Sequence, residues 1–296
     1  MNYQIRKKII FKNNYYLIIP AFIFTLTIFI IPNILNFYYA FTNWSAYHSQ
    51  VNFVGLRNFI ELTKEGYLWR GLFTTIKYAV FITIVENSMA LVLALVLEKT
   101  SRINGFLRSV FFLPVLISPL AAGYLFRGIL DPKGSLNHLL SNIFFTKINF
   151  PWLGTLSLTI FVAGLVHAWK WGGIHMLIYI AALNTIPPEL IESARIDGSN
   201  YWQIFKNIKL PLIGPALTFN ISLIFVGALS VFDLIFSLTS GGPGTATQVL
   251  NFFIYKQFST GRFSYATSIS VVLFLVILIT GISLVVFLRK REVEFE

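Results

Sequence analysis

Long apolar stretches alternate with short polar segments along the 296 residues of the chain. A helix that crosses a bilayer needs about 20 predominantly apolar residues. The stretches that meet this length are Tyr16–Phe41, Leu72–Leu97, Phe106–Leu130, Leu156–Leu183, Leu212–Leu238 and Tyr265–Leu288. The pattern therefore predicts an all-α, polytopic membrane protein with six transmembrane helices.

Two prolines, Pro114 and Pro119, lie inside the third stretch. A proline within an apolar helix removes a backbone hydrogen bond, and the carbonyl that it frees needs a partner elsewhere. We therefore expect the third helix to be bent, either as plain architecture or as the place where a cavity opens.

The positions of Lys and Arg predict the orientation of these helices. If the N-terminus is cytoplasmic, the inner segments and helix ends hold more of these bases than the outer ones, as membrane proteins prefer. We therefore predict a basic cytoplasmic segment at residues 1–15, a six-helix transmembrane domain at 16–288 and a cytoplasmic tail at 289–296. Both termini are expected inside.

The composition agrees with a membrane protein. Only 12% of the residues are charged and 56% are hydrophobic, whereas soluble domains carry about 25% charged residues. The net charge of +11 comes from bases scattered at the ends of apolar stretches, so we expect no nucleic-acid partner. The absence of cysteine excludes a disulfide framework and a thiolate metal site.

A polar loop at residues 185–210, between the fourth and fifth stretches, has a helical pattern of its own. Pro188 suits the first position of a helix. Glu189 and Glu192 place acids near its start and Arg195 places a base near its end, which suits the helix dipole. Gly198 then ends the helix, because glycine readily takes the left-handed conformation.

A second short helix follows in the same loop. Asn200 can cap it, with Gln203 three residues later as in a capping box. Its apolar positions follow the spacing of one helix face, and they are Tyr201, Ile204, Phe205 and Ile208. We predict a helix–turn–helix at the cytoplasmic membrane surface; the alternative is a solvated connector.

This loop, ESARIDGSNYWQIFKNIKLP, resembles the E-A-A-x-x-x-G signature of binding-protein-dependent ABC importers, in the longer form of carbohydrate-uptake permeases. Ser193 and Ser199 stand where that family has alanine. The resemblance implies a type I ABC importer permease fold with cytoplasmic coupling helices. It assigns ATPase coupling to Glu192, Ala194, Asp197, Gly198, Trp202 and Phe205.

The segment after the fifth stretch is rich in glycine. A phosphate-binding role is disfavoured because no Gly-Lys-Ser/Thr follows. The plain alternative is a flexible turn. The segment from Phe232 to Thr247 is similar to one found in one of the two permease types of a sugar importer, the maltose-permease-F-like or glycerol-phosphate-permease-A-like half. On this resemblance, the outer loop comprises Gly241, Gly242, Pro243 and Gly244.

No enzyme motif is present: the sequence has no Walker A lysine, no His-Glu-x-x-His and no nucleophile elbow. The four histidines are too dispersed to suggest a metal site. We therefore predict a transport subunit that is not an enzyme and binds no metal or cofactor itself.

Ionisable groups inside apolar spans are functional candidates because they are costly in hydrocarbon. We favour internal hydrogen bonding over solute contact for Glu86 and His167. The polar residues near the fifth stretch are candidates for the solute path, and they are Asn220, Ser222, Ser230 and Asp233.

The family resemblance implies a permease subunit of a bacterial ABC importer in the cytoplasmic membrane. It would take up a sugar or oligosaccharide delivered by an extracytoplasmic solute-binding protein. A second, homologous permease subunit would complete the path, and two ATPase subunits would hold ATP and Mg²⁺. The alternatives are an ABC permease for a non-sugar solute, an ion-coupled secondary transporter, and a membrane scaffold or receptor.

Overall fold

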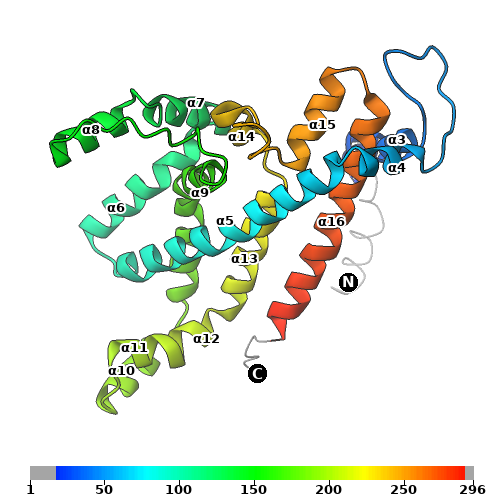
Figure 1. Ribbon diagram of the computed structural model, residues 1–296. Helices are drawn as coiled ribbons and strands as arrows, with labels where there is room; N and C mark the ends of the chain where they lie inside the picture. Colours follow the sequence, from blue (N-terminus) through cyan, green and yellow to red (C-terminus); the bar gives the residue numbers. More distant parts are fainter. Residues whose placement is uncertain (1–17, 291–296) are drawn as a thin grey trace, which may run out of the picture. The chain divides into compact units, whose positions relative to one another are not determined.

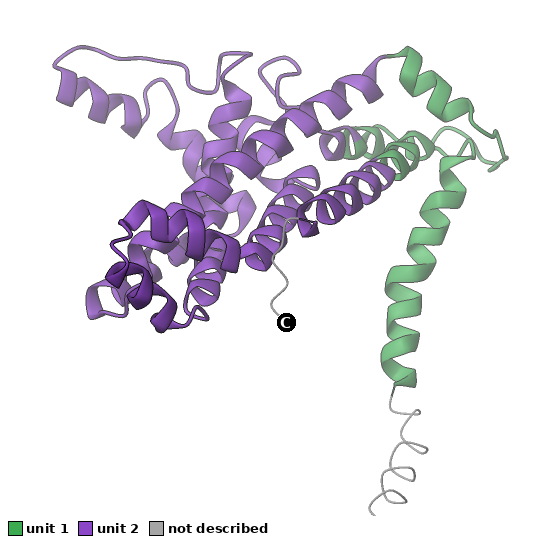
Figure 2. Ribbon diagram, turned by 90° about the horizontal axis from the view of Figure 1, so that it is seen from below, with its two compact units in different colours: residues 1–65, 254–272 green, residues 66–253, 273–296 purple. Residues whose placement is uncertain are grey.

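The computed structural model describes residues 18–290 of the chain. Within this range every extended regular element is a helix, and the β-pairing is confined to an isolated bridge between Thr42 and Phe53. The predicted all-α class is confirmed. The chain forms two compact units, residues 1–65 with 254–272 and residues 66–253 with 273–296 (Figure 2).

The first unit contains a long apolar helical run and a short amphipathic helix. The run consists of α2 (Ile19–Thr25), η2 (Leu26–Ile30) and α3 (Ile31–Ala40), and α4 (Arg57–Lys64) follows. Parts of α15 (Leu250–Ser259) and α16 (Phe263–Arg289) complete the unit. The end of α3 is held because buried Asn58 donates to the carbonyl oxygens of Ala40 and Thr42, both at 2.8 Å.

The second unit holds the remaining helices (Figure 1). Their bounds are α5 Tyr67–Leu97, α6 Arg102–Phe112, η3 Leu113–Leu116, α7 Pro119–Ile129, α8 Ser135–Phe144, α9 Thr159–Leu183, α10 Pro188–Ile196, α11 Tyr201–Ile204, η4 Phe205–Lys209, α12 Leu210–Leu212, α13 Gly214–Leu229 and α14 Asp233–Thr239. The core lies where α5 packs along α9 and α13, and α14 packs on α7.

Small residues allow the helices of this core to approach closely, as is common in membrane bundles. Ala79, Ala90 and Ala163 are fully buried between α5 and its neighbours. Gly173 of α9 lies so close to α6 that an added Cβ would meet the carbonyl oxygen of Phe111 at 2.2 Å. Packing along α9 therefore leaves no room for a side chain at this position.

Three described helical runs are each long and apolar enough to cross a membrane: Ile19–Ala40, Tyr67–Leu97 and Phe263–Arg289. Three further helix pairs pass the same test together but are bent, and counting each pair as one span gives six. The third predicted span is such a pair, with a 99° bend between Arg102–Leu116 and Pro119–Ile129. The expected proline bend is confirmed.

The fifth predicted stretch, Leu212–Leu238, is not one helix. α13 ends at Leu229, and a new helix, α14, begins at Asp233. The apolar pattern continues across this break and so conceals it. The break is stabilised because Asn251 donates to the carbonyl oxygen of Ser230 at 2.8 Å, which satisfies a group that a continuous helix would satisfy itself.

Candidate functional site

The polar loop between α9 and α13 folds as two short helices. Pro188 occupies the first turn of α10, whose axis is bent by 72° from that of α9. Glu189 lies in the first turn of α10 and Arg195 in the last, as the dipole argument predicted. Figure 1 shows α10 and α11 at the end of this unit opposite α7 and α14.

The turn between these helices depends on Gly198. Its φ angle is +82°, and a Cβ added there would meet no heavy atom within 4 Å. Asn200 then caps α11: the Gln203 N–H donates to Asn200 Oδ1 at 2.9 Å, and the Asn200 N–H donates to Gln203 Oε1 at 2.7 Å. The predicted helix–turn–helix and its capping box are both confirmed.

The tip of this loop is apolar and exposed. Ile196 is 86% exposed and Trp202 is 67% exposed, with the Trp202 ring 5.4 Å from that of Phe205 between centroids. Tyr201 is 61% exposed, whereas Ile204 on the same predicted apolar face is buried. The exposed turn of the loop therefore carries apolar side chains.

The remaining predicted coupling residues surround this tip. Glu192, Asp197 and Gly198 are exposed, and Ala194 is half-buried. Ala194 and Asp197 also line a shallow pocket of about 490 Å³ between α10 and the chain that returns to α13. Four of the six predicted coupling residues are therefore exposed, and Ala194 and Phe205 are half-buried.

An ion pair that sequence analysis did not predict fastens this loop to α5. Lys209 Nζ lies 2.5 Å from Glu98 Oε1, and the Lys209 side chain is only 7% exposed. Arg108 donates to the carbonyl oxygens of Leu97 at 2.6 Å and Glu98 at 3.0 Å, and so satisfies the end of α5. The end of α5 is thus joined to both η4 and α6.

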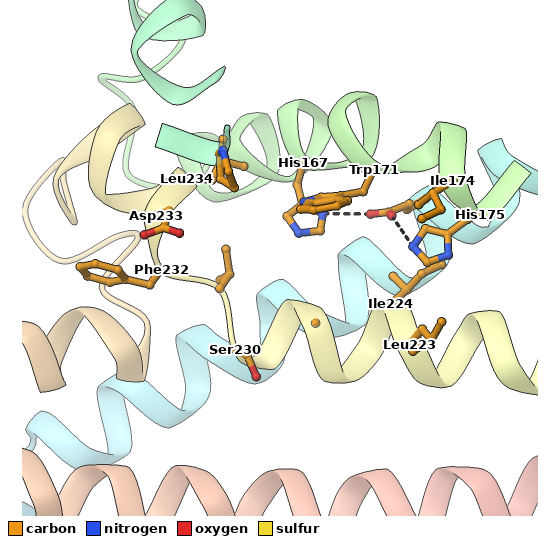
Figure 3. A pocket seen from close by; sticks show the side chains of 14 residues that line it. His167, Trp171, Ile174, His175, Leu223, Ile224, Ser230, Phe232, Asp233 and Leu234 are labelled. Atoms are coloured by element: carbon orange, nitrogen blue, oxygen red, sulfur yellow. Dashed lines mark hydrogen bonds and ion pairs between the residues drawn. The ribbon is translucent and has the colours of Figure 1, made fainter. Parts of the chain in front are cut away.

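A cavity of about 360 Å³ lies among α9, α13 and the segment that leads to α14 (Figure 3). Of the residues predicted for the solute path, Ser230 and Asp233 line it. Asn220 does not line the cavity, because it is fully buried and hydrogen-bonded to His175. Ser222 binds the carbonyl oxygen of Thr218 in its own helix at 2.7 Å.

A buried cluster of ionisable side chains forms part of the cavity wall. Glu86 of α5 is fully buried, with its Oε2 atom 2.9 Å from Nδ1 of His167 and its Oε1 atom 3.2 Å from Nε2 of His175. The hydrogen bond expected for Glu86 and His167 is present, and both residues also line the cavity. The two histidines, both on α9, meet at one carboxylate.

The sequence does contain a signal for this cluster. His167, Trp171 and His175 are spaced four residues apart, which places them on one face of α9. All three line the cavity. Among the residues that the structure describes, no group of three or more His, Asp or Glu side chains is arranged to hold a metal ion.

The loop Gly241–Gly244 is held by specific contacts. Thr247 donates its hydroxyl to the carbonyl oxygen of Gly242 at 2.8 Å and lies 2.7 Å from the hydroxyl of Thr239. Gly241 has φ +81°, and an added Cβ would lie 2.7 Å from the Phe252 ring. These contacts favour a defined turn over the flexible one that was the plain alternative.

Comparison with known proteins gives consistent matches. Residues 86–292 match the family described as binding-protein-dependent transport system inner membrane components. A probable starch degradation products transport system permease of Thermoanaerobacterium thermosulfurigenes is 33% identical, over 98% of this chain and 99% of that protein. The sn-glycerol-3-phosphate transport system permease of Shigella flexneri is 32% identical, over 90% of each chain.

A solved structure has the same fold. A chain from a bacterial ABC transporter involved in the import of the acidic polysaccharide alginate superposes with a TM-score of 0.82. It is 24% identical, and the match covers 97% of this chain and 99% of that one. The arrangement of helices described above is therefore shared with that chain.

Proposed function

This chain belongs to the family of binding-protein-dependent transport system inner membrane components, and from that membership we propose that it is the permease subunit of a bacterial ABC importer for a sugar or oligosaccharide. It forms part of the solute path and does not hydrolyse ATP. Hydrolysis takes place on separate ATPase subunits, which carry ATP and Mg²⁺.

The exposed apolar tip at residues 196–205 is the observation that carries this proposal. Ile196 and Trp202 would be costly to leave in water, and the tip is a protruding turn rather than a membrane-spanning surface. It suits insertion into a cleft of an ATPase subunit. Glu192 and Asp197, both exposed, add the negative charge that a basic residue of the ATPase would pair with.

The ion pair between Lys209 and Glu98 supports a path for coupling. A movement of the docked loop would be transmitted by this ion pair to α5, which carries Glu86 at the cavity wall. A rigid helix that is joined to a docked loop at one end and lines a cavity along its length is the kind of element whose shift opens or closes access.

The partners follow from the family and from charge. A second, homologous permease completes the path, two ATPase subunits serve the pair, and a solute-binding protein delivers the solute from the outer side. Excess Lys and Arg on the segments that include residues 185–210 supports an orientation with the loop and both termini in the cytoplasm. The membrane is the bacterial cytoplasmic membrane.

The solute class rests on the relatives. Proteins named for transport of starch degradation products and of trehalose and maltose match nearly the whole chain. A carbohydrate is accordingly the solute we propose, taken up through the cavity that Ser230 and Asp233 line. Their hydroxyl and carboxylate groups suit hydroxyl-rich molecules.

Two matched glycine variants test the docking role. Gly198 and Gly66 both have positive φ angles, +82° and +74°, and both have open space around an added Cβ. Valine at either position strains the backbone similarly, but only Gly198 lies in the proposed docking turn. In liposomes that contain the assembled importer, we expect G198V to abolish ATP-driven sugar uptake and G66V to retain it.

Equal uptake by both variants would contradict the docking role. Insertion and assembly are measured in parallel by the yield of each variant in detergent-purified complex. G198N serves as a rescue, because asparagine tolerates the left-handed conformation better than valine does; we expect it to restore part of the uptake.

A further inference from the structure

The short helix α8 lies in the connection between two candidate membrane spans. The bent pair α6–α7 before it ends at Ile129, and α9 begins after it at Thr159. Both span ends and α8 therefore lie at the same membrane surface. Figure 1 shows α8 extending sideways from α7, at the end of the unit opposite α10 and α11.

The polar side chains of α8 bind the protein instead of pointing into water. Asn137 is buried: its Nδ2 group donates to the carbonyl oxygen of Phe150, and its Oδ1 atom accepts from Trp152 Nε1, both at 2.9 Å. The Ser141 hydroxyl oxygen accepts from the Ile148 N–H, also at 2.9 Å. These bonds fasten α8 to the segment that returns toward α9.

An apolar stripe, Leu139 and Ile143, lies on the other side of this helix. Leu139 and Ile143 are one turn apart, and the rotation of about 100° per residue places them roughly opposite Asn137 and Ser141. They are 56% and 58% exposed. Apolar side chains held outward by inward-bound polar ones are costly in water, so this stripe requires an apolar cover.

The end of α8 places a further aromatic ring outside the protein. Phe145 has a φ angle of +49°, in the left-handed region that usually holds glycine at a helix end. A bulky residue is strained there, and the Phe145 side chain is 95% exposed. A glycine would make the same turn without strain, so the ring itself points to a surrounding apolar medium.

A basic pocket borders the polar side of α8. It has a volume of about 500 Å³, and Lys133, His138 and Lys147 are among its lining residues. Both lysines are exposed, and neither forms an ion pair with a described acid. Asp131 accepts from the backbone N–H of Lys133 at 2.9 Å but does not line the pocket. The next acid along the chain is Glu189, so the charge of the pocket is unbalanced.

We propose that α8 is an interfacial helix that binds anionic lipid. The apolar stripe lies against acyl chains, and Lys133 and Lys147 contact headgroup phosphates at the basic pocket. The proposal rests on the membrane location of the family and on α8 itself, and it does not depend on which solute is carried. With the loop at residues 185–210 in the cytoplasm, the lipid belongs to the outer leaflet.

A lipid surface explains both sides of α8 together. The apolar stripe and the basic pocket lie on roughly opposite sides of the helix. A membrane interface presents acyl chains and headgroups in adjacent layers, and a helix that lies in it contacts both. A protein partner would have to surround α8 to do the same. The lack of acids from residue 132 to residue 188 favours an anionic surface.

Quenching by brominated lipid measures the depth of each side of α8. The chain has no cysteine, so I143C and H138C each carry one fluorescent label, on the stripe and on the pocket side. The assembled importer is placed in vesicles of phosphatidylcholine and phosphatidylglycerol. Bromine on the acyl chains should quench the label at I143C strongly and the label at H138C weakly. Equal quenching of both labels, or no quenching at I143C, would overturn the proposal.

The same label at I143C measures the preference for anionic lipid. Brominated phosphatidylglycerol should quench it more than brominated phosphatidylcholine does. K133Q with K147Q should lower this preference by roughly fivefold for each lysine removed. The matched control, K64Q with K256Q, removes two exposed lysines elsewhere and should leave the preference unchanged. The same preference in both double variants would refute the role of the pocket.

Inorganic phosphate distinguishes a lipid from a free anion. Phosphate makes no contact with the apolar stripe, so it should reduce the quenching by phosphatidylglycerol no more than chloride does at equal ionic strength. A larger reduction would assign the pocket to a free anion and overturn the lipid assignment. None of these measurements requires transport. A failure of sugar uptake would therefore contradict the proposed function and leave the lipid result standing.

Discussion

Lys209 and Glu98 join the proposed docking loop, residues 185–210, to α5. Their side chains are 7% and 17% exposed. A pair held this far from solvent interacts more strongly than a surface pair, and removal of one partner leaves the other charge poorly solvated. The sequence pattern shows only two ordinary cytoplasmic charges, 111 positions apart. Their proximity depends on how the helices pack, and no local rule contains that information.

We expect K209E to lower sugar-stimulated ATP hydrolysis by about tenfold, a coupling change of the size usual between two sites. The reversed pair, E98K with K209E, should recover most of the loss because the attraction is restored with exchanged ends. Uptake and ATP hydrolysis are measured together in liposomes, with K206E, an exposed lysine on η4, as the control. A double variant no better than K209E would refute a direct link.

Other residues were predictable because their partners are close in the chain. The reciprocal bonds between Asn200 and Gln203 span three residues, and a capping box can be recognised from that spacing alone. The contact between His167 and Glu86 spans 81 residues. A buried partner for Glu86 could be expected because a carboxylate is costly in an apolar span. The identity of that partner could not be predicted without the fold.

At the scale of elements, apolar length predicted the helices well and their interruptions less well. Pro114 and Pro119 predict the bend between α6 and α7, because proline lacks the N–H that continues the backbone hydrogen bonds of a helix. No such residue marks the end of α13 at Leu229. The carbonyl oxygen of Ser230 at this break accepts a hydrogen bond from Asn251 of α15. The hydropathy pattern does not indicate this contact.

Two helical glycines give a matched test of close packing. G173A would place a Cβ 2.2 Å from the carbonyl oxygen of Phe111, so α6 and α9 must separate. We expect a loss of about 1–3 kcal/mol, as for other overpacked cores. G105A, in α6, meets nothing within 4 Å and should be neutral or stabilising by up to about 1 kcal/mol.

Thermal unfolding of both variants in detergent measures these changes. The two substitutions add the same methyl group to helices of the same unit, so the comparison isolates the neighbour rather than the helix propensity. Equal melting temperatures for G173A and G105A would show that α6 and α9 can separate at this contact without loss of stability.

In the whole molecule, one permease subunit contains the proposed docking loop, a connecting helix and a cavity. The loop contributes exposed apolar side chains, α5 contributes the connection through Glu98, and the cavity wall contributes Glu86 with its two histidines. The loop was predictable because its motif and caps are local. The cavity was not, because its lining comes from helices that are distant in sequence.

The central claim is that the loop at residues 185–210 meets an ATPase subunit on the cytoplasmic side. The chain contains no cysteine, so one introduced cysteine is a unique probe. We would place it at Ile196, which is 86% exposed, and at Lys64 of α4 as the outer control. Labelling with a membrane-impermeant maleimide, followed by cross-linking in the assembled importer, reports both side and partner.

We expect I196C to react only from the cytoplasmic side and to cross-link to the ATPase subunit, and K64C to react only from outside and form no such adduct. Labelling of I196C from outside, or cytoplasmic labelling with no ATPase adduct in an importer that is active, would contradict the account.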